Sequence, residues 1–529
     1  MTNRNAVLDI GAKLWSLCHV LRDDGVTYHE YLNELTYLLF LKMMKETSEQ
    51  DLLKVIKAIS RKKDSPKVEQ PGIRWDDLLN TPSSERLDTY KEMLLEYDLH
   101  GCKAVQEIYA NADTVIKKAA TLDKLVTEID ALDWYSIGRD DLGDLYESLL
   151  ERSAGEKKSG AGQYFTPRHL IDSIVAVMKP QLTDVIQDPA AGTGGFLIAV
   201  NNYLRAHNDF SCLPKDILRN YREQTFFGME IVKDTHRLAL MNMLLHGLEG
   251  TITYGDTLSN DCKKLPPATL ILSNPPFGTK KGGGLPTRDD LTYSTSNKQL
   301  AFLQHIYQGL KPGGRAAVVL PDNVLFEANL GTDIRRDLMH KCNLHTILRL
   351  PPGIFYAQGV NTNVLFFTRG KTNKDNTKEV WFYDMRTNMP QFGKRTPFTR
   401  DYFRTPVDAP SDIPRDKFED VFGDDPQGGL EALARRIDTG ENGRWRKFTR
   451  DEIAARGDNL NISWLKDDGV ESSEAQRDEP AIVARLALRE LNEAVAELRT
   501  LLEELGEDAD LALDDIALDV VENSSGATK

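Results

Sequence analysis

The chain has few cysteines and no long hydrophobic segment. Its 529 residues include only five cysteines, which are widely spaced and form no C-x-x-C pair. The sequence therefore predicts neither a disulfide framework nor a metal site. The longest apolar run, residues 35–41, is far shorter than the ~20 residues that span a membrane, and the N-terminus lacks a signal-peptide pattern. We therefore expect a cytoplasmic protein without a membrane anchor.

Basic charge is not in excess either. Lys and Arg total 66 against 81 Asp and Glu, a formal net charge of −15. Residues 503–529 hold nine acids and one lysine, so about half of this charge lies at the C-terminal end. The net charge argues against binding of nucleic acid by bulk electrostatic attraction alone, although the rest of the chain is only mildly acidic. The hydrophobic fraction of 40% is that of an ordinary folded protein, and the length predicts two to four domains at ~150 residues each.

Hydrophobic spacing divides the chain into five segments. Residues 1–152 show helical periodicity without an alternating strand pattern, which predicts an N-terminal helical domain. Residues 153–400 alternate short β-rich runs with helical segments, which predicts an α/β domain whose mostly parallel sheet has helices on both faces. Residues 401–474 look like an irregular extension. Residues 475–506 place apolar side chains in alternating 3- and 4-residue steps, which predicts a long helix packed on its own chain or another. Residues 507–529 form an acidic tail.

The first motif is a glycine-rich turn between a predicted strand and a predicted helix, Asp188-Pro-Ala-Ala-Gly-Thr-Gly-Gly-Phe196. Gly192, Gly194 and Gly195 let the backbone turn tightly and approach a ligand, and the helix N-terminus presents free N–H groups. Such a turn could serve a nicotinamide cofactor, a phosphate or only a sharp bend. The full G-x-G-x-x-G spacing is missing. No G-x-x-x-x-G-K-[ST] sequence occurs, which argues against nucleotide hydrolysis.

Acidic residues close the next two predicted strands. Glu230 ends Phe-Gly-Met-Glu, where a carboxylate can accept hydrogen bonds from both ribose hydroxyls of an adenosine-bearing cofactor. Its separation from Asp188 is about twice the usual ~20 residues, which an insertion near residues 208–221 would explain. Asp256 and Thr257 end the following strand, where they would meet the adenine of the cofactor. A lone acid at such a position can equally be a helix cap.

The fourth motif is Ser273-Asn274-Pro275-Pro276-Phe277-Gly278, directly after a predicted strand. Two consecutive prolines fix φ twice and remove two donors, so this loop is rigid and presents acceptors only. The Asn274 side-chain oxygen and the Pro275 carbonyl can both accept from one amino group, and Phe277 can stack on a planar base turned out of a duplex. An amine that attacks an electrophilic methyl group gains positive charge, which two fixed acceptors stabilise. Alone, the loop could be a proline-stiffened turn with a core Phe, but its position after three cofactor-type motifs favours amine binding.

Together, the glycine turn and the Asn-Pro-Pro-Phe loop resemble the S-adenosylmethionine-dependent adenine-N6 DNA methyltransferases. The segment Gly162-Gln-Tyr-Phe-Thr-Pro-Arg168 looks like the cofactor-binding segment that members with this motif order place first. The helical N-terminal segment and Thr332-Asp-Ile-Arg-Arg-Asp-Leu338 extend the resemblance over essentially the whole chain. The match is to the HsdM-type modification subunit of type I restriction–modification systems.

The resemblance implies a Rossmann-like methyltransferase core with an N-terminal helical domain and a C-terminal long helix, and S-adenosyl-L-methionine as cofactor. Glu230 would hold the ribose, Asp256 the adenine side, and the glycine turn with residues 163–168 the methionine part. The target adenine would be gripped by Asn274, Pro275, Pro276 and Phe277. The cofactor-binding residues it implies are Gln163, Tyr164, Phe165, Thr166, Pro167, Arg168, Asp188, Ala190, Gly192, Thr193, Gly194, Gly195, Phe196, Glu230, Asp256 and Thr257. The residues alone do not separate adenine-N6 from cytosine-N4, although Asn before and Phe after the prolines favour adenine.

Few residues remain for reading a DNA sequence. About seventy irregular residues follow the core, fewer than the ~100–150 of a typical domain. The resemblance therefore implies that a separate specificity subunit reads double-stranded DNA and docks on residues 475–506. It also implies a second copy of the modification subunit and an ATP-dependent restriction subunit in the full complex. The lysine pairs 157–158 and 280–281 either touch phosphates or are solvated loop residues.

Two other functions compete with this interpretation. Protein-glutamine methyltransferases also use an Asn-Pro-Pro loop, but theirs favours Tyr in the last position. A catalytically silent assembly subunit would not need the intact Asn274, Gly192 and Glu230. A self-sufficient restriction enzyme is excluded, because Pro321-Asp322 has no Glu-x-Lys close behind it.

Overall fold

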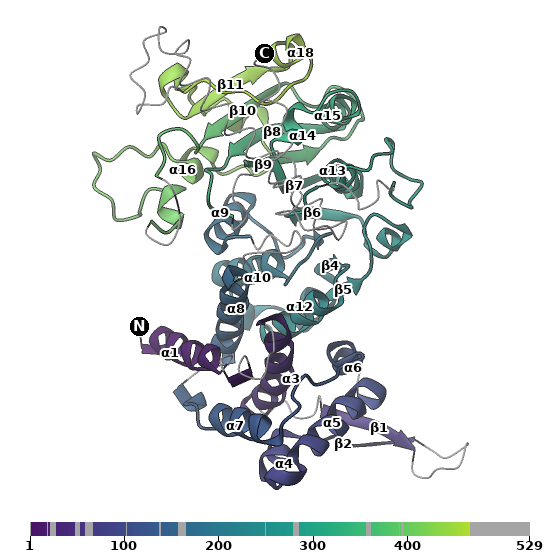
Figure 1. The fold of residues 1–529 in the computed structure, drawn as a ribbon. Helices are drawn as coiled ribbons and strands as arrows, with labels where there is room; N and C mark the ends of the chain where they lie inside the picture. The colour runs from purple at the N-terminus through teal and green to yellow at the C-terminus, as the bar shows by residue number, and fades with distance from the viewer. Residues whose placement is uncertain are drawn as a thin grey trace, which may run out of the picture. The chain divides into compact units, whose positions relative to one another are not determined.

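The described part of residues 1–156 is mainly helical, as the sequence predicts (Figure 1). The computed structural model describes residues 2–17, 20–21, 28–47, 53–58, 67–101, 103–136, 139–156, 166–248, 250–278, 285–355, 361–390, 392 and 396–465. The predicted helix at 475–506 and the acidic tail at 507–529 lie outside these residues. The helices of this region are α1 (Thr2–Ser16), α3 (Tyr28–Glu46), α4 (Trp75–Asn80), α5 (Ser83–His100), α6 (Lys103–Tyr109), α7 (Ala119–Asp130) and α8 (Arg139–Glu156).

Helical periodicity explains the core of this region. The apolar stripe of α3, which includes Leu32, Leu35 and Leu38, is buried together with Leu145 and Leu149 of α8. Residues at i, i+3 and i+4 share one helix face, so each stripe turns inward. Leu238, Met241 and Leu245 of α12 (Lys233–Leu245) belong to the same core. We call this set of buried side chains the helical core.

One feature of the N-terminal region contradicts the sequence analysis, which found no strands there. The strands β1 (Lys54–Ala58) and β2 (Lys67–Pro71) form an antiparallel hairpin. All five residues of β2 are exposed and Val55 of β1 is fully buried. Because so little of the hairpin is buried, its sequence shows almost no alternation of apolar and polar residues, which is the pattern that predicts a strand.

A nine-stranded sheet forms the rest of the fold, in the order β11-β10-β8-β9-β7-β6-β3-β4-β5. Its pairs are parallel from β7 through β6, β3 and β4 to β5 and between β8 and β10, and antiparallel at β7–β9, β8–β9 and β10–β11. The strands are β3 (Ile186–Asp188), β4 (Phe226–Glu230), β5 (Thr251–Tyr254), β6 (Ala268–Ser273), β7 (Leu310–Pro321), β8 (Cys342–Arg349), β9 (Thr362–Arg369), β10 (Glu379–Asp384) and β11 (Trp445–Thr449). The predicted α/β class is confirmed, with a mixed sheet.

Helices cover both faces of this sheet. Leu270 and Leu272 of β6 face one hydrophobic core, and Ile271 between them faces the other, as the two-residue period of a strand requires. The first core includes residues of α9 and α10, and the second includes residues of α13 and α15. The helices of this region are α9 (Arg168–Met178), α10 (Gly195–His207), α11 (Lys215–Gln224), α12, α13 (Lys298–Gly309), α14 (Asn323–Phe326), α15 (Leu330–Lys341), α16 (Phe418–Phe422), α17 (Leu430–Leu433) and α18 (Arg450–Ala455).

Residues 401–465 are more ordered than the irregular extension that the sequence predicts. Strand β11 pairs with β10, and its Trp445 packs in the first core against Trp381 and Phe418. The sequence does not predict these elements, because elements of four to six residues are too short to show a hydrophobic period. The segment is also rich in Pro, Gly and Asp, which favour loops. Burial of the large aromatic rings holds the segment on the sheet instead.

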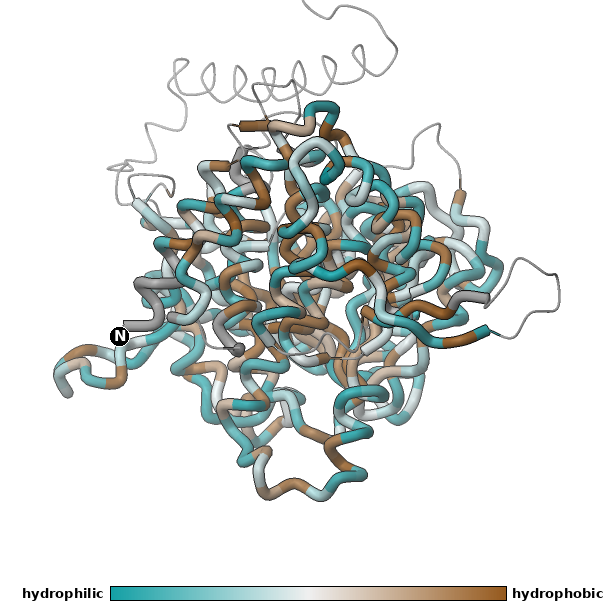
Figure 2. Tube along the Cα trace, turned by 90° about the horizontal axis from the view of Figure 1, so that it is seen from below, coloured by the Kyte–Doolittle hydropathy of each residue, from teal (hydrophilic) through white to brown (hydrophobic). Residues whose placement is uncertain are grey.

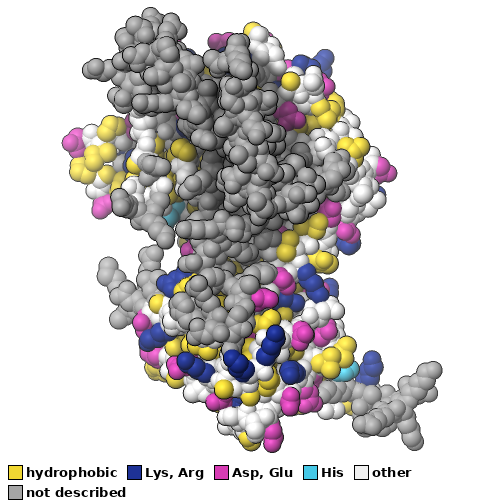
Figure 3. Space-filling view, in the orientation of Figure 1, with side chains coloured by type: hydrophobic (Ala, Val, Ile, Leu, Met, Phe, Trp, Pro, Cys, Tyr) yellow, Lys and Arg dark blue, Asp and Glu magenta, His cyan; other side chains and the backbone are white. Residues whose placement is uncertain are grey.

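The surface is mixed in character. Hydrophobic and hydrophilic residues alternate along the trace (Figure 2). On the face shown in Figure 3, basic and acidic side chains are interspersed over the N-terminal helical part. Within the described part of the chain, no helix combines the length and apolar character needed to cross a bilayer.

Candidate functional site

A cavity of about 240 Å³ opens at the carboxyl ends of β3, β4 and β6 and beside the loop after β5. Strand β3 lies between β6 and β4, so the chain changes direction across the sheet at this point, where open α/β sheets bind their ligands. The residues predicted from sequence that line the cavity are Thr166, Asp188, Ala190, Gly192, Thr193, Gly195, Phe196, Glu230, Asp256, Thr257, Asn274, Pro275 and Pro276. The topology thus brings four separate motifs to one place.

The glycine turn forms the floor of the cavity. Gly192 (φ +55°) and Gly194 (φ +84°) both adopt the left-handed conformation, which other residues adopt only with strain. A Cβ built on Gly192 meets no atom within 4 Å, so the space next to it is open. A Cβ on Gly194 points instead toward Ile252 and Met243, at 3.8 and 3.9 Å. Gly192 is therefore the glycine that lets a ligand approach, and Gly194 serves the start of α10.

Asp188 joins the glycine turn to the Asn-Pro-Pro loop. Its Oδ1 accepts hydrogen bonds from the Ser273 hydroxyl at 2.7 Å and from the Ala190 N–H at 3.1 Å. The side chain is 2% exposed, and burial, with a smaller contribution from the charge of Glu230, raises the pKa of Asp188 to about 7. Asp188 therefore fixes Ser273, the residue that precedes Asn274.

Glu230 fixes the glycine turn from the opposite side. Its Oε2 accepts from the Gly192 N–H at 3.0 Å and its Oε1 accepts from the Val232 N–H at 2.7 Å. Burial raises the pKa of this carboxyl. Each carboxylate oxygen has a second lone pair, so Glu230 can hold the turn and still accept hydrogen bonds from a ligand hydroxyl.

Asp256 and Thr257 line the cavity and also stabilise their own loop. Asp256 Oδ1 accepts from the Leu258 N–H at 2.8 Å, and the Thr257 hydroxyl donates to the Pro189 carbonyl at 2.6 Å. The short 3-10 helix that follows is capped by Ser259, not by Asp256. Asp256 is therefore a turn residue at the edge of the cavity.

Asn274 connects the Asn-Pro-Pro loop to the segment before α9. Its Nδ2 donates to the Thr166 hydroxyl at 2.9 Å, across 108 residues of sequence. Pro275 and Pro276 line the cavity beside it. Phe277 does not: its ring is partly buried against the core that includes α9 and α10. The predicted stacking surface thus lies outside the cavity lining.

Pro167 and Arg168 are described but do not line the cavity. Arg168 begins α9, and its guanidinium binds Glu147 at 2.6 Å and Asp172 at 3.1 Å. Pro167 is the residue before this helix. Gln163, Tyr164 and Phe165 lie outside the described residues.

One wall of the cavity is apolar and was not predicted from the sequence. Leu32 of α3 and Leu150 of α8 come from the helical region, and Phe302 comes from α13. In the sequence, these residues are recognisable only as part of an apolar helix stripe. Such a stripe predicts that a side chain is buried, but not what it contacts. The other apolar lining residues are Ile171, Met229, Ile231, Val232 and Leu238. A mostly apolar wall with a few fixed polar groups is typical of a site for an organic cofactor.

Comparison with known proteins places this site in a family. Residues 137–468 match the family model of the N-6 DNA methylases, and residues 10–129 match that of the HsdM N-terminal domain. The chain is 46% identical to the methylase subunit of the type I restriction enzyme EcoKI of Escherichia coli K12, over 95% of this chain and 97% of that protein. It is also 46% identical to the StySJI methylase subunit of Salmonella typhimurium, over 94% and 95% of the two chains. The crystal structure of the EcoKI M protein is 43% identical, with a TM-score of 0.52 over 96% of this chain and 99% of that one.

Proposed function

We propose that the cavity of this chain binds S-adenosyl-L-methionine beside the target adenine. The premise is that the chain belongs to the N-6 DNA methylases. It is the methylase subunit of a type I restriction–modification system, which methylates adenine N6 in DNA. The observation that supports this is a pair of hydrogen bonds: the Ser273 hydroxyl donates to Asp188, and the Gly192 N–H donates to Glu230. Together they hold the glycine turn, the strand-end acid and the Asn-Pro-Pro loop around one cavity.

The residues present fit this cofactor. The open space beside Gly192 would be filled by any larger side chain, and the cavity wall is mainly apolar. Glu230 would accept hydrogen bonds from ribose hydroxyls, Asp256 would lie on the adenine side, and the N–H groups at the start of α10 would face the methionine carboxylate. Thr193 and Thr166 would contribute hydroxyl groups to the methionine part. Bound there, the cofactor supplies an electrophilic methyl group on a sulfonium.

The Asn-Pro-Pro loop would hold the adenine amino group. The bond from the Asn274 Nδ2 to Thr166 fixes the amide plane, so its oxygen and the Pro275 carbonyl would accept the two N6 hydrogens. As N6 formed a bond to the methyl carbon, the sulfonium sulfur would leave as a thioether and N6 would carry the positive charge. The two acceptors would stabilise that charge before N6 released a proton to solvent. No side chain needs to form a covalent bond to the base.

Labelled methyl transfer tests this proposal. A complex of this chain with a type I specificity subunit would be given S-adenosylmethionine carrying a labelled methyl group and target DNA. We expect Asn274→Ala to reduce transfer about 100-fold or more, the usual loss when one such stabilising group is removed, while cofactor affinity stays within about threefold.

The matched control is Asn343→Ala, which loses a similar bond, from Nδ2 to the Gly428 carbonyl at 2.8 Å, on β8 away from the cavity. This variant should keep full transfer. Loss of cofactor binding in Asn274→Ala, or equal transfer by both variants, would show that the loop is misassigned.

We further propose that residues 475–506 dock the specificity subunit, which reads the target in double-stranded DNA, and that a second copy of this chain and the restriction subunit complete the assembly. The support is the heptad spacing of the segment, which calls for a partner helix. Deletion of residues 475–529 should abolish co-purification with the specificity subunit, and deletion of residues 507–529 alone should not. Unchanged association after the longer deletion would refute this docking role.

A further inference from the structure

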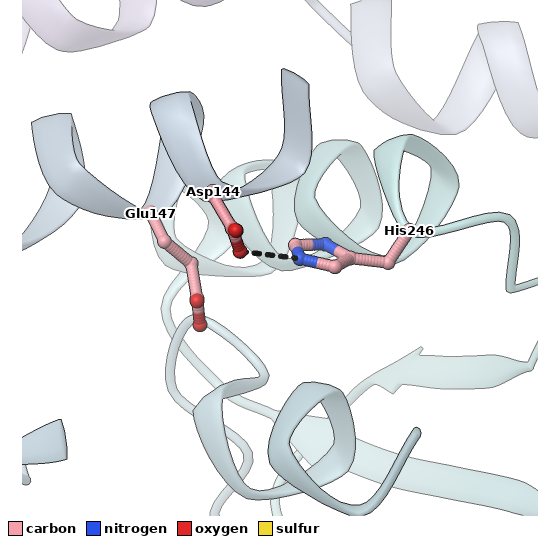
Figure 4. Close-up of side chains that lie close together, drawn as sticks. All are labelled: Asp144, Glu147 and His246. Atoms are coloured by element: carbon pink, nitrogen blue, oxygen red, sulfur yellow. Dashed lines mark ion pairs between the residues drawn. The ribbon is translucent and has the colours of Figure 1, made fainter. Parts of the chain in front are cut away.

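Three potential metal ligands meet where α8 contacts α12. Asp144 and Glu147 lie one turn apart on α8, and His246 directly follows α12 (Figure 4). Each residue offers one ligand atom, and these three atoms lie within 4.8 Å of one another. Among the described residues this is the one such group. The group lies outside the methyl-transfer cavity, and none of the three residues lines it.

The protonation of His246 is fixed by its neighbour. Nδ1 lies 2.8 Å from the carbonyl oxygen of Asn242, which can only accept, so Nδ1 carries the proton. In the neutral ring the lone pair is then on Nε2. Metal-binding histidines are usually oriented by a backbone carbonyl in this way.

The Nε2 lone pair faces negative oxygen atoms. The His246 side chain is 5% exposed, and its Nε2 has no hydrogen-bond partner among the described residues. The nearest carboxylate atom, Asp144 Oδ1, is 4.0 Å away, too far for a hydrogen bond (Figure 4). A buried lone pair that faces two carboxylates is repelled by them unless a proton or a cation lies between.

Charge in the surroundings also favours a cation. Arg168 Nη1 holds Glu147 Oε1 at 2.6 Å, so an ion would use the other oxygen of Glu147. The charged groups around the cluster are the carboxylates of Glu151 and Asp172 and the guanidinium groups of Arg168 and Arg205. Counting Asp144 and Glu147, carboxylates outnumber guanidinium groups, so a divalent ion would reduce the net charge.

The helix backbone is shaped to admit the imidazole. A Cβ on Gly143 would lie 2.5 Å from His246 Cε1 and 2.6 Å from Nε2. Glycine inside a helix costs about 0.5–1 kcal/mol relative to alanine, and here it allows the close approach of the ring to α8. The absence of a side chain at Gly143 therefore leaves the space that the imidazole occupies, and any larger residue would fill that space.

We propose that Asp144, Glu147 and His246 bind one divalent first-row transition-metal ion of the zinc type. Metal–nitrogen and metal–oxygen distances of about 2.1 Å place the ligands of a tetrahedral ion roughly 3.4 Å apart. The three atoms, which lie within 4.8 Å of one another, must therefore close in by up to about 1.4 Å, and the side chain of Asp144, 61% exposed, has room to move. An imidazole ligand favours zinc-type ions over Mg²⁺ and Ca²⁺, which prefer oxygen.

Such an ion would join two helices that also line the cavity. Leu150 lies on α8, and Thr235 and Leu238 lie on α12. The ion would thus stabilise the wall to which the helical region contributes, whether or not the cavity holds the ligands proposed above.

Metal titration of the full chain tests this site. After treatment with a chelator and its removal, Zn²⁺, Mn²⁺ and Mg²⁺ would be titrated separately by calorimetry and the melting temperature recorded. We expect one Zn²⁺ site per chain that raises the melting temperature, and no Mg²⁺ binding there. Asp144→Asn should weaken Zn²⁺ binding at least tenfold with little change in the metal-free melting temperature, because the side chain is exposed. Gly143→Ala, which displaces the ring, should also weaken it.

The control is His207→Gln. His207 makes the same bond, from Nδ1 to the carbonyl of the residue four positions earlier, at 2.7 Å, but belongs to no three-ligand group among the described residues. This variant should bind Zn²⁺ as the unchanged chain does, and His246→Gln should lose the site. Absence of Zn²⁺ binding, equal binding by Asp144→Asn, or Mg²⁺ binding as tight as that of Zn²⁺ would overturn the proposal.

Discussion

Glu34 in the helical region and Asp188 in the sheet region are both buried carboxyl groups whose pKa burial raises to about 7, but the two groups are held differently. Glu34 on α3 uses both oxygens: Oε1 accepts from the Tyr90 and Thr114 hydroxyls and Oε2 accepts from the Val115 N–H. Asp188 uses only Oδ1 and lines the cavity. The first network is closed and ties helices together, whereas the second leaves one side facing the space where a ligand would bind.

The two regions also meet in the cavity wall. Arg237 of α12 donates to the carbonyls of Ile108 and Ala110 in the helical region, at 2.7 and 3.1 Å. Leu32 and Leu150 then extend from that region into the cavity lining. The helical region therefore completes the wall of the pocket.

The largest effect should come from Gly192→Asp in the sheet region. Its side chain would enter the open space beside the turn, so we expect no detectable S-adenosylmethionine binding by calorimetry. Gly440→Asp is the control, because Gly440 also has a positive φ (+70°) and open space within 4 Å but lies far from the cavity. Both variants share a conformational cost of about 1–2 kcal/mol, so similar cofactor affinities in the two would mean that the cavity does not bind the cofactor.

Leu32→Ala tests the contribution of the helical region. We expect a loss of about 2–5 kcal/mol in the free energy of unfolding, as for other buried leucines, together with roughly fivefold weaker cofactor binding as apolar contact is lost. Leu78→Ala removes an equally buried leucine of the helical core that does not line the cavity. It should lose stability alone. If both variants bind cofactor normally, the helical region has no part in the pocket.

Glu34→Gln should cost about 1–3 kcal/mol of unfolding free energy even at pH 6, because the new amide group must place a donor against the Val115 N–H or against a hydroxyl donor. Asp188→Asn should cost little at that pH, because the amide oxygen can replace Oδ1 as acceptor from Ser273 and Ala190. Denaturant unfolding of the two variants measures the difference. Equal losses would contradict the contrast between a closed network and an open one.

The smallest effect is on the pH dependence of stability. The pKa of each carboxyl is higher in the folded chain, about 7, than in the unfolded one, so the folded state binds more protons. Both groups stabilise the fold at low pH, and that contribution is lost as the pH rises through 7. Asp188→Asn should therefore flatten the decline in unfolding free energy between pH 5 and pH 8. An unchanged slope would show that Asp188 is ionised throughout.

The sequence predicted most of the sheet-region site because its residues follow strand ends, where local order and topology together determine position. Gly192, Glu230 and Asn274 were placed in this way, and all three line the cavity. Leu32 and Leu150 were not, because a helix stripe indicates which face is buried but not what it meets. The cluster of Asp144, Glu147 and His246 shows no spacing signal for the same reason, since its parts lie about 100 residues apart.

Phe277 and Arg168 show a second limit of prediction from sequence, which concerns the direction of a side chain within a motif. Both lie in or beside motifs that the sequence assigns to ligands, yet the Phe277 ring packs against the first core and the Arg168 guanidinium binds Glu147. A short motif fixes the backbone path but leaves the direction of a long or bulky side chain to its tertiary neighbours. For such residues the sequence predicts the region of the site and not the contact.

The identity of the modified nucleoside tests the central claim most directly. Mass spectrometry of DNA from cells that carry this chain together with its specificity subunit should show N6-methyladenine, which should disappear when either the subunit is absent or Asn274 is replaced by alanine. N4-methylcytosine in its place, or N6-methyladenine that persists at the same level in Asn274→Ala, would contradict the account.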